Sequence, residues 1–247
     1  MKDLLEPFLY PHNLLLYGLL VACICYKKKG LWLLFVFYYV MGNTYIANHV
    51  RHWYSNTLNF AATVDISGAG KTPAESALYI VLGCGGSATQ LPACASARLQ
   101  RLSVELADVA TKQSPAAVLI TTRYCQPYLD ALAARQFAFV VDCYDAGENT
   151  YQEFASLAKR LQKSQPLRFI TSDFHGWRVR KLITEYQFNA SVGVAQTQTF
   201  RAVNCSLNCL FTINLTNLDF YSKLIAEFSS YAIYRFGGAR FTGEVSG

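Results

Sequence analysis

A histidine and an arginine three residues apart are the strongest candidates for chemistry in this sequence. They lie in the segment Thr171-Ser-Asp-Phe-His-Gly-Trp-Arg178, which follows a short apolar run, and on a helix His175 and Arg178 would share one face. Ser172 or Asp173 would cap that helix. An imidazole, a guanidinium and a helix N-terminus would then converge, an arrangement that suits a phosphate or carboxylate group. For His175 alone, a structural hydrogen-bonding role is an equal alternative.

Glycine-rich or polar segments follow the other apolar runs. The first run ends in Gly83-Cys-Gly-Gly86, where backbone N–H groups could approach an anion, although a plain turn is the alternative. Thr121-Thr-Arg123 follows the second run, and Asp145-Ala-Gly-Glu-Asn-Thr150 follows the third; the last three of these residues could be ordinary capping residues. The candidate ligand-binding residues are Gly83, Gly85, Gly86, Arg98, Asn149, Thr150, Thr171, Ser172 and Arg178, and the candidate catalytic residues are His175 and Glu148.

Alternating strand and helix patterns predict how these residues are positioned. Short apolar runs predict buried strands, and apolar residues at helical spacing predict the helices between them. The pattern predicts an α/β fold: a Rossmann-like, doubly wound, mostly parallel sheet of about five strands, with ligands at the carboxyl ends of the strands. The expected strands are 77–83, 116–122, 137–142, 167–171 and 192–196, and the expected helices are 92–110, 127–135, 148–162, 175–186 and 217–236.

Two apolar stretches near the N-terminus, 8–26 and 31–47, predict two transmembrane helices. Each is near the ~20 residues needed to cross ~30 Å of hydrocarbon, and aromatic residues crowd their ends. A cleaved signal peptide is one alternative, but residues 1–7 lack a basic n-region because they contain acidic residues. A buried hairpin of core helices is the other.

The three lysines between these stretches predict the orientation. By the positive-inside rule, Lys27–Lys29 lie in the cytoplasm, so the N-terminus and everything after His49 lie outside, with only Arg51 opposing this orientation. We therefore expect a two-span protein of a bacterial inner membrane, with the spans in 1–48, a linker in 49–76 and a periplasmic α/β domain in 77–247. Gly68-Ala-Gly-Lys-Thr72 resembles the end of a phosphate-binding loop, but it precedes the first strand and is assigned to the linker.

Composition excludes several classes of function. The net charge is +6, but no stripe of basic residues is interleaved with aromatic residues, which argues against nucleic acid as a partner. Six cysteines fall in the α/β domain, where an oxidising compartment would permit disulfides in any of fifteen connectivities. No C-x-x-C pair is present and Cys205 and Cys209 have no nearby histidine, so no metal site is predicted. These residues do not identify a cofactor.

The sequence resembles the SanA/ElyC/YdcF family of bacterial envelope proteins, and its ElyC-like, two-span branch best. The likeness rests on the two spans, the glycine-rich turn, Arg98-Leu99, Glu148-Asn-Thr150 and Thr171-Ser-x-x-His-x-x-Arg178. It covers roughly residues 77–186, with a weaker echo around Glu227 and Tyr231. The sequence departs from the family after the second strand: the family has a glycine-rich turn and an acidic residue, where this chain has Thr121-Thr-Arg-Tyr-Cys-Gln-Pro127.

The resemblance implies a role in cell-envelope biogenesis, in peptidoglycan, surface polysaccharide or the lipid carrier that serves both. The leading hypothesis is a domain that binds a phosphorylated glycan or polyprenyl-lipid intermediate at the membrane and hydrolyses or transfers a phosphoryl group. His175 would be the general acid/base, and Arg98 and Arg178 would clamp the charge. One alternative is a non-catalytic scaffold for envelope synthases. Another is a nucleotide or S-adenosylmethionine binder, which the missing acid after the second strand disfavours.

Overall fold

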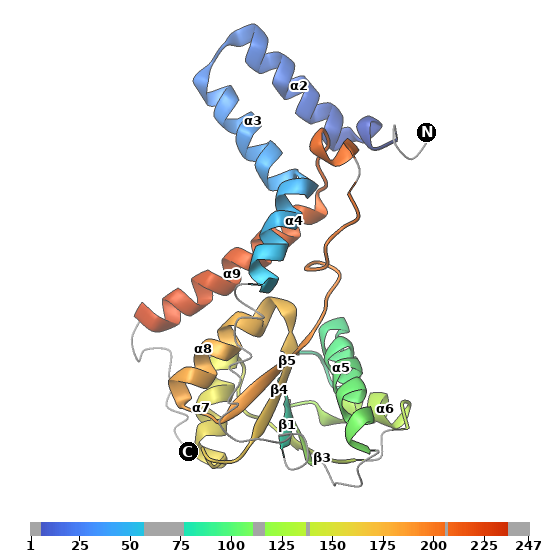
Figure 1. The fold of residues 1–247 in the computed structure, drawn as a ribbon, viewed down its shortest axis with the longest axis vertical. Helices are drawn as coiled ribbons and strands as arrows, with labels where there is room; N and C mark the ends of the chain where they lie inside the picture. Colours follow the sequence, from blue (N-terminus) through green and yellow to red (C-terminus); the bar gives the residue numbers. More distant parts are fainter. Residues whose placement is uncertain (1–5, 57–76, 111–116, 137–138, 206, 237–247) are drawn as a thin grey trace. The chain divides into compact units, whose positions relative to one another are not determined.

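The computed structural model describes residues 6–56, 77–110, 117–136, 139–205 and 207–236, and these fall into two units (Figure 1). One unit consists of residues 1–57 and 198–226, and the other of residues 58–197 and 227–247. Residues 198–226, which we expected in the α/β domain, therefore group with the N-terminal helices. Most of the predicted linker, including Gly68–Thr72, lies outside the described residues.

The second unit contains a five-stranded parallel sheet, which confirms the predicted α/β fold. The strands run in the order β3-β2-β1-β4-β5, and every neighbouring pair is parallel. This is the order of the first five strands of a doubly wound sheet, in which the chain changes direction between β1 and β4. The strands are β1 (Leu78–Val81), β2 (Ala117–Thr121), β3 (Val140–Tyr144), β4 (Leu167–Ser172) and β5 (Ala190–Ala195).

Helices cover both faces of the sheet because alternate strand residues point to opposite sides. Tyr79 and Val81 pack with α5 (Ala93–Ala110) and α6 (Cys125–Ala133). Ile80 and Leu82 pack on the other face, with α7 (Thr150–Arg160) and α8 (Gly176–Tyr186). Figure 1 shows these two pairs of helices on either side of the strands. A hydrophobic core on each face of the sheet thus fixes the strand ends at which the four loops of the carboxyl edge begin.

The segment around His175 differs from the prediction. A short 3-10 helix, η4 (Asp173–His175), precedes α8, so His175 lies before the α-helix rather than in its first turn. Neither expected residue caps α8, because both side chains have other partners. Ser172 Oγ accepts a hydrogen bond from Arg98 Nε at 2.9 Å, and the Asp173 carboxylate accepts from the backbone N–H of Thr197 at 2.7 Å.

The first unit contains η1 (Glu6–Leu9), α2 (Pro11–Tyr26), α3 (Lys29–Gly42) and α4 (Thr44–Trp53). Among the described residues, no helix is both long enough and apolar enough to cross a membrane. The predicted span 31–47 is interrupted at Asn43, whose backbone is extended and whose Oδ1 caps α4 by accepting from the N–H of Ile46 at 3.1 Å. The two expected spans are therefore corrected to helices of 16 and 14 residues.

Arg51 is an internal residue of this unit rather than a charge flanking a span. Its Nη2 donates to Asn217 Oδ1 at 2.9 Å, its Nε donates to the carbonyl of Thr199 at 3.1 Å, and its guanidinium lies 4.5 Å from the ring centroid of Phe220. These contacts tie α4 to the segment that follows β5 and to α9 (Thr216–Phe236). The structure therefore places Arg51 inside this unit, where it is 3% exposed.

Candidate functional site

A pocket of about 350 Å³ opens at the carboxyl ends of the strands. The loops after β1, β2 and β3 form its walls, and His175, which follows β4, completes it. Ligands bind at this edge in doubly wound sheets. The residues that line it are Gly83, Cys84, Gly85, Thr121, Thr122, Arg123, Tyr124, Asp145, Gly147, Glu148, Asn149, Thr150, Glu153 and His175.

The structure brings about half of the predicted site residues into this pocket. Gly83, Gly85, Glu148, Asn149, Thr150 and His175 line it, whereas Gly86, Arg98, Thr171, Ser172 and Arg178 do not. The loop after β2 lines the pocket as well, although none of its residues was among the predicted site residues. It is also the stretch that departs from the pattern of the resembled family.

The glycine-rich turn passes very close to β2 and α7. A Cβ atom on Gly83 would collide with the carbonyl oxygen of Thr121 and lie 3.2 Å from Glu153 Oε1, so only glycine fits there. Gly85 has φ of 71°, in the left-handed region that favours glycine. A disulfide between Cys84 and Cys94 ties this turn to the start of α5. The turn is thereby held with its backbone at the pocket wall.

Glu153 is a buried carboxyl group in the pocket that the sequence prediction missed. Its Oε1 accepts hydrogen bonds from Thr121 Oγ1 at 2.7 Å and from the backbone N–H of Gly83 at 3.2 Å. Burial raises the pKa of Glu153 because desolvation of the carboxylate outweighs these hydrogen bonds and the attraction of Arg98. The sequence held one signal: Glu153 lies in the first turn of α7, directly after the polar segment that follows β3.

His175 is held by a carboxylate from α9. Its Nδ1 lies 3.0 Å from Glu227 Oε2 and 2.6 Å from Arg178 Nη2, and it cannot donate to one and accept from the other at once. We assign the proton to Nδ1, because Glu227 can only accept, whereas Arg178 also has Glu227 Oε2 (2.9 Å) and Ser230 Oγ (2.9 Å) as acceptors. Nε2 is then the unprotonated ring nitrogen.

The surroundings of His175 favour the neutral imidazole. Burial lowers the pKa of His175, and the hydrogen bond to Glu227 opposes this shift without reversing it. Below its ordinary value of 6.5, this pKa leaves the ring neutral at pH 7. A neutral imidazole, with Nδ1 bound by a carboxylate and its ring at a pocket, is the arrangement of a general base.

The two predicted charge clamps are occupied by protein groups. Arg98 is fully buried, and its Nη1 donates to the carbonyls of Leu82 and Gly83, both at 2.6 Å. Burial lowers the pKa of Arg98 to about 10, so it remains charged at pH 7. Arg178 is bound to Glu227 and Ser230. Arg98 thus supports the ends of β1 and β4 from behind, and Arg178 supports the partner of His175.

Glu148, the second predicted catalytic residue, lies at the exposed rim. Its Oε1 is 3.6 Å from Arg123 Nη2, and Arg123 Nε donates to Asp145 Oδ2 at 3.1 Å. Its ion-pair partner Arg123 is itself exposed, in contrast to Glu227, the buried partner that positions His175. Arg123 is the guanidinium that lines the pocket, and because it is exposed it can exchange these carboxylates for a ligand.

The six cysteines of the expected α/β domain are paired. Besides Cys84–Cys94, disulfides join Cys125 to Cys143 and Cys205 to Cys209. Cys125–Cys143 links the start of α6 to β3, next to the pocket loops. Within the parts of the chain that the structure describes, no group of three or more His, Cys, Asp or Glu side chains is placed to hold a metal ion.

The fold and site define an α/β protein with a parallel sheet, a pocket at its carboxyl edge and a histidine–glutamate pair at that pocket. Comparison with known proteins does not narrow this class: no model of a protein family, no curated protein and no solved structure matches the chain.

Replacing Glu153 by glutamine should make the stability of the protein less dependent on pH. The folded-state pKa of Glu153 lies above its ordinary 4.5, so its stabilising contribution is present below pH 4.5 and is lost as pH rises through the folded value. Glutamine keeps Oε1 as an acceptor and carries no charge. We expect thermal unfolding to show that Glu153→Gln is at least as stable as the native chain at about pH 8. At about pH 5 the stability of the variant relative to the native chain should be lower than at about pH 8. Exposed Glu148→Gln is the control. Loss of stability at about pH 8 would contradict the raised pKa.

Proposed function

We propose that this chain is a membrane-anchored protein of cell-envelope biogenesis whose α/β unit binds a phosphorylated ligand, a glycan or polyprenyl lipid, and hydrolyses or transfers its phosphoryl group. The observation that carries the proposal is the pairing of His175 with Glu227 at the wall of the pocket. A binding module needs no such pair. A hydrolase or transferase needs a base whose ring is oriented and neutral at working pH.

The pocket offers complementary groups for this chemistry. His175 Nε2 would take the proton of an attacking hydroxyl or water. Glu153, whose pKa is raised, would supply a proton to the leaving oxygen. The pKa values of the two groups are shifted in opposite directions, as an acid and a base in one site require. Arg123 and the backbone of the glycine turn would bind the phosphate oxygens.

The first unit supports attachment to a membrane. Its helices α2 and α3 pack against each other, and many of their large apolar side chains, such as Leu15, Leu33 and Phe37, are exposed. Between Pro11 and Val50 the sequence has no Asp, Glu, Lys or Arg other than Lys27–Lys29, which would face the cytoplasm. Three disulfides suit the periplasm, because such bonds persist in oxidising compartments. A tether of this kind would hold the site near a lipid-linked substrate.

The resemblance to the SanA/ElyC/YdcF family supplies the biological setting of this proposal. Of the residues that carry it, Glu148, Asn149, Thr150 and His175 line the pocket, while Arg98 and Arg178 support the pocket from outside. An envelope precursor, the lipid bilayer and envelope synthases are the partners that follow from it.

Ligand-dependent unfolding of the full chain in detergent tests the proposed binding. A polyprenyl monophosphate should raise the Tm and the unphosphorylated polyprenol should not; at a concentration of about 100 times Kd the gain is about 2.7 kcal/mol. Inorganic phosphate tests whether the phosphoryl group alone is recognised. An equal response to alcohol and phosphate would contradict the proposal, and stabilisation by S-adenosylmethionine alone would favour a nucleotide binder.

Reporter fusions test the proposed localisation. A reporter enzyme that is active only outside the cytoplasm should be active after Gly247 and inactive in the Lys27–Lys29 turn. The reverse result would refute the periplasmic placement.

A further inference from the structure

The segment that follows β5 has an unusual distribution of polar and apolar groups. We call residues 203–205 and 207–215 the apolar loop; it contains the short 3-10 helix η5 (Leu207–Leu210). From Ala202 to Leu218 the sequence has no Asp, Glu, Lys or Arg. Leu207 is 76% exposed and Phe211 is 61% exposed. The loop thus presents large apolar side chains outward, on a stretch without charge.

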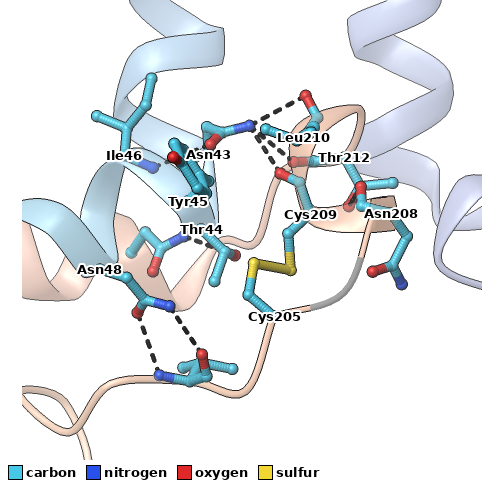
Figure 2. Close-up of a disulfide and its surroundings, with 12 residues drawn as sticks. Asn43, Thr44, Tyr45, Ile46, Asn48, Cys205, Asn208, Cys209, Leu210 and Thr212 are labelled. Carbon is cyan, nitrogen blue, oxygen red and sulfur yellow. Dashed lines mark hydrogen bonds between the residues drawn. A yellow bond between two sulfur atoms is a disulfide. The ribbon is translucent and has the colours of Figure 1, made fainter.

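The backbone of the apolar loop is bound by side chains from α2 and α3. Asn43 Nδ2 donates to the carbonyl of Cys209 at 2.8 Å (Figure 2), and Tyr39 Oη donates to the carbonyl of Leu210 at 2.6 Å. Tyr17 Oη donates to the carbonyl of Phe211 at 3.1 Å. These bonds satisfy carbonyl groups that a loop in water would leave to solvent.

Asn13 makes the same kind of contact from the start of α2. Its Oδ1 accepts from the N–H of Ile213 at 2.6 Å, and its Nδ2 donates to the carbonyl of Ile213 at 3.3 Å. Asn13 and Asn43 are both 0% exposed. The disulfide Cys205–Cys209 closes the loop beside Asn43 (Figure 2). Irregular backbone is therefore held in place by buried amides and a covalent link.

This arrangement is the reverse of a water-facing loop. Soluble proteins bury apolar side chains and leave loop backbone to water. Here Asn13 and Asn43 are buried against the loop, and side chains of α2, α3 and Asn43 donate to the carbonyls of Cys209, Leu210, Phe211 and Ile213. Leu207 and Phe211 face outward, although Ile213 is buried. Non-helical backbone is tolerated at membrane depth only where protein satisfies its hydrogen bonds, which is the condition that Asn13, Tyr17, Tyr39 and Asn43 meet.

The position of the apolar loop complements the short helices. α2 is ~24 Å long and α3 is ~21 Å long at 1.5 Å per residue, less than the ~30 Å of a hydrocarbon layer. The loop is bound to the first residues of α2 and to Asn43, just past the last residue of α3. This is the end of the hairpin opposite Lys27–Lys29, so the loop adds apolar surface where the helices stop.

We infer that the apolar loop is a third lipid-contacting element, which enters the outer side of the bilayer beside the α2–α3 hairpin. The inference rests on the proposed membrane attachment. The inference places the apolar loop, which lies between β5 and α9, in contact with the membrane, whereas the sequence pattern assigned these residues to the periplasmic domain. The exposed Leu207 and Phe211 would contact lipid acyl chains. Lys27–Lys29, at the opposite end of the α2–α3 hairpin, would contact anionic headgroups.

Photolabelling from within the bilayer tests the inference on the unmodified chain. The full protein would be reconstituted in phosphatidylethanolamine–phosphatidylglycerol vesicles that contain a lipid with a diazirine on its acyl chain, and the labelled residues mapped by mass spectrometry. We expect label on Leu33 and Phe37 of α3 and on Leu207 and Phe211 of the loop. Val140, 81% exposed on the edge strand β3, should remain unlabelled.

The outcomes separate the two proposals. Label on α3 without label on the loop overturns the inference and leaves the membrane attachment standing. Absence of label from both overturns both. As a second measurement, Leu207→Lys with Phe211→Lys should reduce the fraction of protein that floats with vesicles, while Val140→Lys should not. Both changes are on exposed side chains, so circular dichroism in detergent should be unchanged, and equal flotation of all three proteins would overturn the inference.

Discussion

Replacing Arg98 by alanine is expected to lower the free energy of unfolding by about 3–5 kcal/mol, because each buried acceptor left unpaired costs about 1–3 kcal/mol. Arg98 is 1% exposed and donates to the carbonyls of Leu82 and Gly83 and to Ser172 Oγ. Its loss removes all three bonds and leaves a cavity between α5 and the ends of β1 and β4. Urea unfolding of the full chain in detergent measures the change.

Arg101 on the same helix is the matched control. It pairs with Glu105 four residues on and is partly exposed, so Arg101→Ala should cost no more than about 1 kcal/mol. Arg98→Lys should lie between the two, because an ammonium group lacks the planar fork that reaches Ser172 and both carbonyls at once. If Arg98→Ala and Arg101→Ala were equally stable, the supporting role of Arg98 would be refuted.

Replacing His175 by alanine should abolish function in cells while leaving stability nearly unchanged. The loss of a general base typically reduces a rate by about 10²–10⁴-fold, and a half-buried residue at a strand end supports little core. Complementation of a strain that lacks the gene measures function, and thermal unfolding measures stability. Full complementation by His175→Ala would contradict the proposed catalysis and favour the scaffold alternative.

Glu227→Gln tests the positioning of His175 through the pH profile. The base acts in its neutral form, so activity should fall as pH drops through the lowered pKa of His175, below 6.5. Glu227 raises that pKa, so its neutral replacement should move the acid limb to lower pH and reduce the maximum rate. Glu148→Gln at the exposed rim is the control. An unmoved limb would show that Glu227 does not act through His175.

Local patterns of apolar residues predict much of the α/β fold. Apolar runs predicted segments that overlap all five strands, and the inner strands β1, β2 and β4 are largely buried, as is usual for parallel strands covered on both faces. Boundaries shifted where the pattern was weakest, as at β3, an edge strand with exposed Val140, and at His175, where η4 precedes α8. The strand order that brings the loops after β1, β2 and β3 together depends on pairings between distant residues, which residue spacing does not report.

The direction in which each charged side chain points could not be read from residue type. Arg98 and Arg178 had the chemistry of phosphate clamps, but their guanidinium groups are taken by Gly83 and Glu227. The partner of His175 lies 52 residues away along the chain, so no local spacing could have revealed it. Glu153 lies within one helical turn of the predicted site residue Thr150. What distinguishes it from a surface acid is its burial and its hydrogen bond from the N–H of Gly83, which only the folded chain shows.

By itself the sequence determined the parallel α/β fold and showed that the N-terminal segment consists of two apolar stretches separated by Lys27–Lys29, because both features depend on local hydrophobicity. Only the tertiary structure decided where that segment breaks and what packs against it. Asn43 ends the apolar run as a helix cap and turns its amide to a loop that lies more than 160 residues away, at Cys209. The physical reason is that a polar group inside an apolar stretch must find a partner, and the partner's identity is a property of the folded chain.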